Sequence, residues 1–508
     1  MSYMNPIIPG FYPDPSVCRV GEDYYLVNSS FEYFPGVPVF HSRDLVHWRQ
    51  LGHVLTRPTQ LPLAACACSG GIYAPTLRWH DGLFYLVTTN VSNIGNFYVT
   101  ATDPAGPWSE PILVEQGGID PSLFFDDDGT VYFTSNGHPD GIGQCRIDPV
   151  TGRRLSETRL IWRGAGGRYV EGPHLYKING VYYLLCAEGG TEYGHMETCA
   201  RSDSPWGPFE SCPHNPILTH RNRGGHPIQG TGHADLVQAH DGKWWLVFLA
   251  FRATGGDFHH CGRETFLAPV TWTADGWPLV NGDGAVELQM DAVTLPRHPW
   301  PALPIRDDFS EEILGVAWNY LRNPQMDDYT LDARAGWLRL HGSALTLDDS
   351  DTPTFVGRRQ QHLTCRIAAY LDFTPTRDGE EAGLTVLMNS SHHYEIAITT
   401  VGGERCAIVR RRIGDLSAIV AREPLPNGPV ILAVDAHLDR YLFSVHPAGA
   451  ACRITLASAA TRYLSSEVAG GFTGVYFGLY ATGNGVPNAT PADFDWFDYE
   501  GITDSLPE

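Results

Sequence analysis

Residues 12–27 read YPDPSVCRVGEDYYLV, an acid between two prolines followed by two short apolar segments around a tight turn. The same outline returns as YAPTLRWHDGLFYLV from Tyr73, IDPSLFFDDDGTVYF from Ile119, VEGPHLYKINGVYYLL from Val170 and GHADLVQAHDGKWWLVF from Gly232. Copies recur about every 50 residues, which is the size of a four-stranded propeller blade. We therefore predict an all-β fold in which residues 1–295 form a five-bladed β-propeller. The alternative is a long β-sandwich whose segments resemble each other by chance.

The repeat disappears after a proline-dense stretch, TLPRHPWPALPIRDDFS, at residues 294–310. Pro-rich segments between patterned regions are typical of linkers, and we assign 296–306 to one. Residues 307–508 contain alternating stretches such as HHYEIAITTVGG and VILAVDAHLDRYLFSVH, which indicate short antiparallel strands. They predict a second domain, a β-sandwich of jelly-roll, concanavalin-like type.

The formal net charge of −22 opposes binding to nucleic-acid backbones and anionic membranes, so we expect neither as a partner. No apolar run reaches the length of a membrane span, and the first residues lack the pattern of a secretory leader. Eleven cysteines are scattered through strand-like segments, as expected for free thiols in a reducing compartment. Cys66 and Cys68 form a close pair without a second pair at zinc spacing. We expect a cytoplasmic protein.

The position before the repeat proline differs among the five copies. It holds Asp14, Ala74, Asp120, Gly172 (preceded by Glu171) and, in the fifth copy, a residue near Ala234. Because Ala and Gly fill this position, the fold itself requires no acid there. The first strand of each blade lines the central channel, so three carboxylates should converge on one cavity. Paired acids in a pocket are what glycoside hydrolysis needs, whereas the alternative is that the Asp-Pro pairs only cap turns.

Several segments closely resemble glycoside hydrolase family 43, in its two-domain β-xylosidase and α-L-arabinofuranosidase branch. They are NPIIPGFYPDPSV, GGIYAPTLR, GGIDPSLFFDDDG, YVEGPHLYKINGVYYLL, AEGGTEYGH and GRETFL, with GGFTGVYFGLY and PADFDWFDYEG resembling the C-terminal sandwich. The resemblance implies that Asp14 is the general base that activates water and Glu171 the general acid. It implies that Asp120 tunes the pKa of the acid and orients it.

The same resemblance assigns substrate-binding residues. Arg263 in GRETFL matches an arginine that binds the sugar at the cleavage site, the alternative being a surface arginine paired with Glu264. The surrounding DFHHCGRE segment is then a substrate-lining loop. His233 matches a channel histidine that in some relatives holds Ca²⁺ through water, the alternative being a hydrogen-bonded core histidine.

Aromatic residues are expected to form the pocket walls. Phe31 and Tyr73 match positions where the family places rings against the pentose, although Tyr73 stands where we expect tryptophan in the best-known xylosidases. Phe472 in GGFTG matches a sandwich residue that closes the pocket, so the second domain should contribute to the active site. The alternative for Phe472 is core packing within a strand.

Together these features predict an exo-acting, inverting glycoside hydrolase that needs no cofactor. It would release a terminal pentose, L-arabinofuranose and/or D-xylose, from arabinoxylan- or xylan-derived oligosaccharides. A non-catalytic carbohydrate-binding propeller and an endo-arabinanase-like hydrolase are the alternatives. A five-bladed fructan hydrolase lacks support, because its NDPNG and RDP motifs are absent. Relatives often form homo-oligomers, and the sequence neither supports nor excludes one here.

Overall fold

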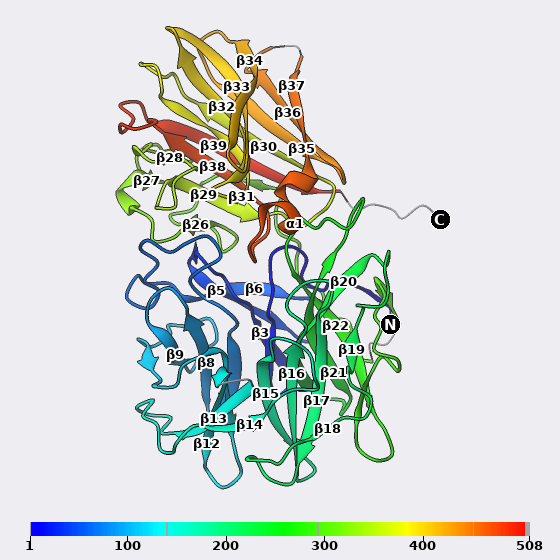
Figure 1. The fold of residues 1–508 in the computed structure, drawn as a ribbon. Helices are drawn as coiled ribbons and strands as arrows, with labels where there is room; N and C mark the ends of the chain where they lie inside the picture. The colour runs from blue at the N-terminus through cyan, green and yellow to red at the C-terminus, as the bar shows by residue number, and fades with distance from the viewer. Residues whose placement is uncertain (1, 139–140, 292–293, 451, 503–508) are drawn as a thin grey trace.

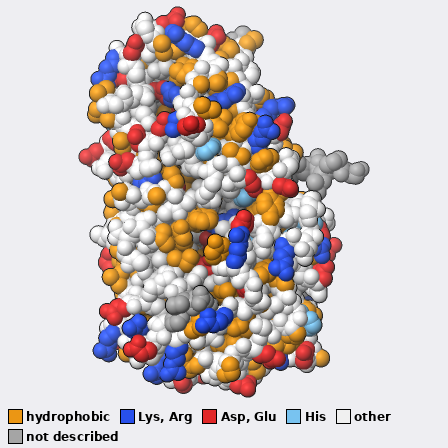
Figure 2. All heavy atoms as spheres, viewed as in Figure 1, with side chains coloured by type: hydrophobic (Ala, Val, Ile, Leu, Met, Phe, Trp, Pro, Cys, Tyr) orange, Lys and Arg blue, Asp and Glu red, His pale blue; other side chains and the backbone are white. Residues whose placement is uncertain are grey.

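The computed structural model describes residues 2–138, 141–291, 294–450 and 452–502, so the end of the predicted sandwich, 503–508, lies outside the described residues. Figure 1 shows two bodies stacked end to end, one blue to green and the other yellow to red. Helix is confined, in the described residues, to α1 (Ser466–Ala469), η1 (Met326–Asp328) and η2 (Thr461–Leu464). None of these is long or apolar enough to cross a bilayer. On the face in Figure 2, acidic and basic side chains are interspersed over both bodies.

The first body is a five-bladed β-propeller, as predicted. Blade I contains β2 (Ser16–Val20), β3 (Asp23–Val27), β5 (Gly36–Ser42) and β6 (Arg49–Leu55). Blade II contains β7 (Thr76–His80), β8 (Leu83–Asn90), β9 (Gly95–Ala101) and β10 (Ile112–Leu113). Blade III contains β11 (Ile119–Phe125), β12 (Val131–His138), β13 (Gly141–Ile147) and β14 (Arg159–Trp162). Blade IV contains β15 (Glu171–Ile178), β16 (Val181–Glu188), β17 (Met196–Ser202) and β18 (Glu210–Ser211), with β19 (Leu218–Thr219) also on β17. Blade V contains β20 (Ile228–Gln238), β21 (Trp244–Arg252), β22 (Glu264–Trp272) and β23 (Pro278–Val280).

Two-residue turns form the first hairpin of blades II and IV. Asp81 and Gly82 join β7 to β8 with φ of 48° and 83°, and Asn179 and Gly180 join β15 to β16 with 52° and 84°. A two-residue hairpin of type I′ needs positive φ at both positions, which Asp-Gly and Asn-Gly supply at low cost. These turns reverse β7 and β15 immediately after they leave the channel.

The five innermost strands, β2, β7, β11, β15 and β20, contact one another in a closed ring around the axis. The N-terminal segment helps to close that ring, because β1 (Tyr3–Met4) pairs with β24 (Gln289–Met290) after the last blade. Ile8 also forms a bridge with Thr265 in β22. The start of the chain is therefore held against blade V, beside the beginning of β2.

The innermost strands are irregular near the channel mouth. Register shifts occur between Ile119 and Ser122, between Glu171 and His174, and between Gly232 and Asp235. Bulges of this kind bend a strand and re-aim a side chain. The residue inside each shift has left-handed φ: 53° for Asp120, 57° for Gly172 and 52° for His233, and Asp14 just before β2 has 51°.

These angles refine the sequence-based alignment of blade V. The position equivalent to Asp14 and Asp120, expected near Ala234, is the adjacent residue His233. The fifth copy has no proline to mark the position, and the backbone conformation identifies it instead.

The second body is a two-sheet β-sandwich, as predicted. One sheet runs β27 (Tyr329–Thr330), β28 (Leu338–Leu340), β39 (Ala492–Gly501), β30 (Cys365–Asp372), β35 (Val430–Ala436), β36 (Arg440–Pro447) and β37 (Ile454–Ala460), with β25 (Arg306–Asp307) on β39. The other runs β34 (Leu416–Pro424), β33 (Glu404–Ile413), β32 (His392–Val401), β31 (Glu381–Asn389), β38 (Tyr476–Thr482), β29 (Thr354–Arg359), β26 (Asn319–Leu321) and β4 (Tyr33–Phe34). A continuous apolar core between them includes Phe443, Phe477 and Phe494.

The last strand of the second sheet comes from the propeller. Residues 33–34 of β4 leave blade I and pair with β26, so that Phe34 faces Tyr320. Tyr33 stacks on Tyr476 of β38 with ring centroids 4.0 Å apart. A shared apolar cluster contains Phe11 and Phe31 of the propeller together with sandwich residues. The two bodies are therefore joined by a sheet and a core as well as by the chain between them.

Candidate active site

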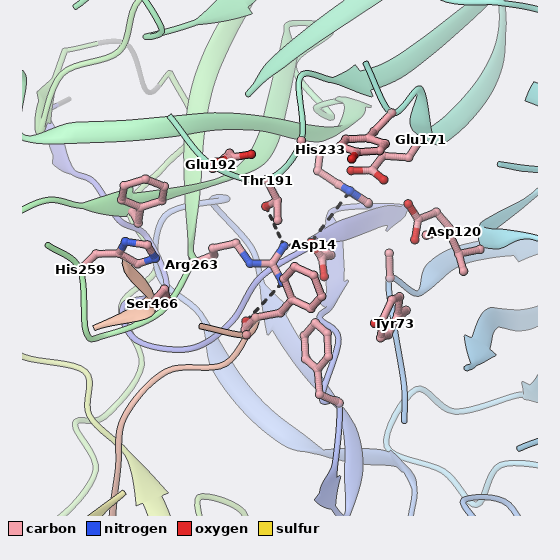
Figure 3. Close-up of a pocket in the computed structure, with 18 of the residues that line it drawn as sticks. Asp14, Tyr73, Asp120, Glu171, Thr191, Glu192, His233, His259, Arg263 and Ser466 are labelled. Atoms are coloured by element: carbon pink, nitrogen blue, oxygen red, sulfur yellow. Dashed lines mark hydrogen bonds and ion pairs between the residues drawn. The ribbon is translucent and has the colours of Figure 1, made fainter. Parts of the chain in front are cut away.

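A cavity of about 540 Å³ lies where the mouth of the propeller channel meets the sandwich. Figure 3 shows the acids and Arg263 gathered around it. All eight residues that the sequence predicts for the site line this cavity: Asp14, Phe31, Tyr73, Asp120, Glu171, His233, Arg263 and Phe472. The structure thus brings together side chains that are up to 458 positions apart in the sequence.

Asp14 is buried and held on both carboxylate oxygens. Arg263 donates a hydrogen bond to Oδ1 at 2.9 Å, and the hydroxyl of Ser29 donates to Oδ2. Burial alone would raise the pKa of Asp14, but Arg263, His233 and Ser29 together lower it below its ordinary value. Asp14 is therefore an ionised carboxylate at neutral pH, and its contacts are not those of a turn-capping residue.

Asp120 and Glu171 have raised pKa values, in contrast to Asp14. Burial, followed by repulsion from Asp14, raises the pKa of Glu171 to about 7, although Arg263 opposes this. Burial and the charges of Glu171 and Asp14 raise the pKa of Asp120 well above its ordinary value. This pair of carboxyl groups therefore keeps a proton at a pH where Asp14 has lost its own.

The backbone of blade IV connects these two acids. The amide of Gly172 donates a hydrogen bond to Asp120 Oδ2 at 3.1 Å, so Asp120 holds the residue next to Glu171. A side chain on Gly172 would meet the His233 ring, since an added Cβ would lie 3.0 Å from Cε1. Glycine is required there both by the left-handed φ and by this close approach.

Arg263 is the one arginine or lysine among the described residues that line the cavity. It also donates to Thr191 Oγ1 at 2.9 Å and to the carbonyl of Phe472 at 3.3 Å. Its Nε is buried and has no hydrogen-bond partner among the described residues. Glu264 instead pairs with Arg252, with a hydrogen bond of 2.7 Å, so the alternative of a surface Arg263–Glu264 pair is wrong.

Three rings form one wall of the cavity. Phe31 packs against Tyr73 and Phe472, with centroids 5.3 Å and 6.0 Å away. Phe472 lies in the loop between α1 and β38 and is 38% exposed, so the alternative of core packing in a strand is wrong. Its amide donates to Ser69 Oγ at 2.9 Å, which ties the loop to the propeller.

His233 lies 3.9 Å from Asp14, measured between Nδ1 and Oδ1. Burial lowers its pKa, so the ring is neutral at neutral pH. Ca²⁺ prefers six to eight oxygen ligands. Here the oxygens of Asp14 are engaged by Arg263 and Ser29, and no group of three metal-ligating side chains occurs among the described residues. These side chains therefore do not form a direct Ca²⁺ site, and Ca²⁺ held through water at His233 stays a prediction.

Several cavity residues were not singled out in the sequence. Thr191 and Tyr193 belong to the Gly-rich segment AEGGTEYGH, whose composition is a weak signal for a loop at a site. His259, from the predicted substrate-lining loop, forms a 2.6 Å hydrogen bond with Glu467 of α1. No local pattern marks Glu467, because its role depends on contact with a distant segment.

Two known protein-family models match most of the chain. The model of glycosyl hydrolases family 43 matches residues 3–278, more than half of the chain. The chain belongs to glycoside hydrolase family 43. A second model, for the β-xylosidase C-terminal concanavalin A-like domain, matches residues 306–500. As a family 43 member the chain is a glycosidase, and the alternative of a non-catalytic binding propeller is set aside.

Within family 43, similar proteins span nearly the whole chain. The non-reducing end α-L-arabinofuranosidase BoGH43B of Bacteroides ovatus is 49% identical, with 98% of this chain and 94% of that protein covered. A xylosidase/arabinosidase of Butyrivibrio fibrisolvens is 40% identical, with 98% and 99% covered. The solved structure described as Bacteroides ovatus Xyloglucan PUL GH43B superimposes with a TM-score of 0.96 at 48% identity, covering 99% of this chain and 100% of that one.

Proposed function

We propose that this family 43 glycosidase is an exo-acting, inverting enzyme that releases a terminal pentose from arabinoxylan- or xylan-derived oligosaccharides. The proposal rests on one observation, which is that the three buried carboxyl groups differ in protonation at neutral pH. Asp14 is held ionised, whereas Asp120 and Glu171 retain a proton. Environments that push the pKa values of neighbouring acids apart are how acid and base roles are assigned in glycosidases.

In this mechanism Asp14 accepts a proton from the attacking water, and Glu171 donates one to the leaving oxygen. Asp120 holds Gly172 and shares a proton with Glu171, because burial and the nearby charges of Glu171 and Asp14 raise the pKa of Asp120. Arg263 and the three rings hold the sugar so that water can approach from the side of Asp14. Direct displacement by water inverts the anomeric centre.

The position of Phe472 supports exo action over an endo-arabinanase-like mode. Arg263 and Ser69 of the propeller both bind the backbone of Phe472, so this loop crosses one side of the cavity. A polysaccharide that ran through the site would have to pass the loop. A chain end can enter instead, and one terminal sugar reaches the acids.

We propose L-arabinofuranose as the preferred pentose and D-xylose as the second. The names of the two full-length relatives, an arabinofuranosidase and a xylosidase/arabinosidase, support this order. The two sugars present similar hydroxyl patterns, so one pocket can accept both.

The test compares 4-nitrophenyl α-L-arabinofuranoside with 4-nitrophenyl β-D-xylopyranoside, and follows the first-formed anomer by proton NMR. We expect the larger kcat/KM on the arabinofuranoside and initial release of the β-anomer from it. Release of the α-anomer would overturn the inverting mechanism. A larger kcat/KM on the xyloside would reverse the order of sugars.

The pKa values predict a bell-shaped pH profile for kcat/KM. Activity requires ionised Asp14 and protonated Glu171, so it should fall tenfold per pH unit as the pH rises through about 7. Asp120→Asn removes the second carboxyl group of the pair that shares this proton, so the mutual repulsion that retains it is lost and we expect the alkaline limb to move to lower pH. An alkaline limb unchanged in Asp120→Asn would contradict the role given to Asp120.

Phe472→Ala should weaken sugar binding without unfolding the sandwich, because the ring is partly exposed and lies outside the sandwich core. We expect kcat/KM to fall by about one to two orders of magnitude, because a misplaced substrate loses much of its rate. Ile419→Ala, which removes an exposed apolar side chain on β34, is the matched control and should retain full activity. Equal activity of both variants would show that Phe472 does not shape the pocket.

We also propose a cytoplasmic location. All eleven cysteines are free and most are buried. Burial raises the pKa of thiols such as Cys145, to about 11, which keeps them unreactive. Assembly into a homo-oligomer stays a prediction.

A further inference from the structure

The cavity is larger than one pentose needs. Cavities of roughly 300 to 1,000 Å³ hold drug-sized ligands, and this one has about 540 Å³. The acids, Arg263 and the three rings occupy its inner part. Tyr169, Gly190 and Glu192 also line it, and no role in the reaction has yet been given to them. With Arg168 they form a group that we call the rim platform.

The residues of the rim platform contact one another, although the Arg168, Tyr169 and Glu192 side chains are exposed. The guanidinium of Arg168 donates to the carbonyl of Gly189 at 2.9 Å and pairs with Glu192. The amide of Gly189 donates back to the carbonyl of Arg168 at 2.7 Å. Arg168 also lies 5.2 Å from the centre of the Tyr169 ring, close enough for a cation–π contact.

Tyr169 combines an exposed side chain with an unusual backbone conformation. Its side chain is 63% exposed, although it lines a cavity, and its backbone has a left-handed φ of 54°. A left-handed conformation is unfavourable for a bulky residue and persists where surrounding structure enforces it, often at functional sites. Gly190 lies directly against the platform, since an added Cβ would be 3.3 Å from both Tyr169 Cδ2 and Arg168.

A packing role does not account for this arrangement. A ring that served the core would be covered, whereas the Tyr169 ring faces solvent and the cavity. Its hydroxyl forms no hydrogen bond within the described part of the chain. The Arg168 guanidinium lies over one face of the ring, and an exposed ring beside a guanidinium and a carboxylate matches the needs of a sugar. The ring face packs on the C–H face of a pyranose, and the charged groups bind its hydroxyls.

The chain connects this ring to the chemistry. Tyr169 precedes Glu171 by two residues, and both side chains line the same cavity. Glu171 must reach the oxygen of the leaving sugar, so that sugar lies beside Glu171 and toward the mouth. We propose that Tyr169 is a specificity-determining residue that stacks on the pyranosyl ring of the leaving chain. This inference rests on the proposed function, in which Glu171 protonates that leaving oxygen.

The inference is tested with two substrates that share the terminal arabinofuranose and differ in what leaves. One is an arabinofuranosyl-xylo-oligosaccharide and the other is methyl α-L-arabinofuranoside, whose leaving group is too small to reach the platform. For Tyr169→Ala we expect kcat/KM to fall about tenfold on the oligosaccharide, mainly through KM, and to change less than twofold on the methyl glycoside. Tyr169→Phe keeps the ring and should match the wild type on both.

Trp79→Ala is the matched control, because Trp79 is an exposed aromatic residue outside the cavity. It should match the wild type on both substrates. Equal losses on the two substrates for Tyr169→Ala would overturn the inference, and so would an unchanged kcat/KM on the oligosaccharide. If the wild type released arabinose from neither substrate, the proposed function itself would fail, a result separate from any effect at Tyr169.

Discussion

Asp14→Asn is expected to lower kcat/KM by about 10³- to 10⁴-fold on every substrate, whatever its leaving group. Asparagine has nearly the shape of aspartate but cannot accept a proton from water. The loss follows from the chemistry of the attacking side, so a better leaving group should not restore the rate. Steady-state kinetics on nitrophenyl and oligosaccharide substrates would measure it.

The control for this variant is Asp126→Asn. Asp126 is a buried aspartate of the same propeller, paired with Lys177 at 2.8 Å and outside the cavity. Both substitutions remove one buried, paired carboxylate, so thermal unfolding should change by a comparable amount, while Asp126→Asn keeps its activity. An Asp14→Asn variant that retained a tenth of wild-type activity would refute the assignment of Asp14 as the base.

Glu171→Gln is expected to show the opposite dependence on the leaving group. With an oligosaccharide, whose leaving hydroxyl needs a proton, kcat should fall by about 10²- to 10⁴-fold. With a dinitrophenyl glycoside, whose leaving group departs as a stable anion, the fall should be at least tenfold smaller. The variant should also lose the decline above about pH 7, because the group that titrates there is gone.

Asp14→Asn supplies the internal comparison for Glu171→Gln. The loss of activity in Asp14→Asn should not depend on the leaving group, whereas the loss in Glu171→Gln should. Only that contrast distinguishes activation of water from protonation of the leaving group. Equal losses on both substrates in Glu171→Gln would argue against acid catalysis by Glu171.

The propeller could be predicted from sequence because each blade carries the same local signal. The Asp-Gly and Asn-Gly turns and the alternating strands occur within about 15 residues, so local sequence determines local structure. The fifth blade shows the limit of this signal. It lacks the proline, so the sequence places its channel position only near Ala234, and the φ of His233 identifies the residue.

The carboxylates were predictable for a related reason. Asp14 and Asp120 occupy a position that Ala74 and Gly172 fill in other blades, so comparison within one chain separates the requirements of function from those of the fold. Their unequal pKa values were not predictable. Those values depend on Arg263, on Ser29 and on burial, none of which a repeat alignment reveals.

The contribution of the sandwich could be anticipated only through the family resemblance. Phe472 and Glu467 meet propeller residues more than 200 positions away, and nothing near them in the sequence indicates that contact. Tyr169 was not singled out in the sequence. Its exposure and left-handed φ emerge only from the fold.

Strand β4 belongs to the propeller segment of the chain but completes a sheet of the sandwich. This shared strand limits how such proteins can evolve. Because residues 33–34 complete a sheet whose other strands begin near residue 319, no single point along the chain separates the two bodies cleanly. A recombination event at the proline-rich stretch would leave one gene with an unpaired strand and the other with an uncovered sheet edge. Selection should therefore transmit the two halves as one heritable unit, with changes in sugar preference arising by substitution in both halves rather than by exchange of modules.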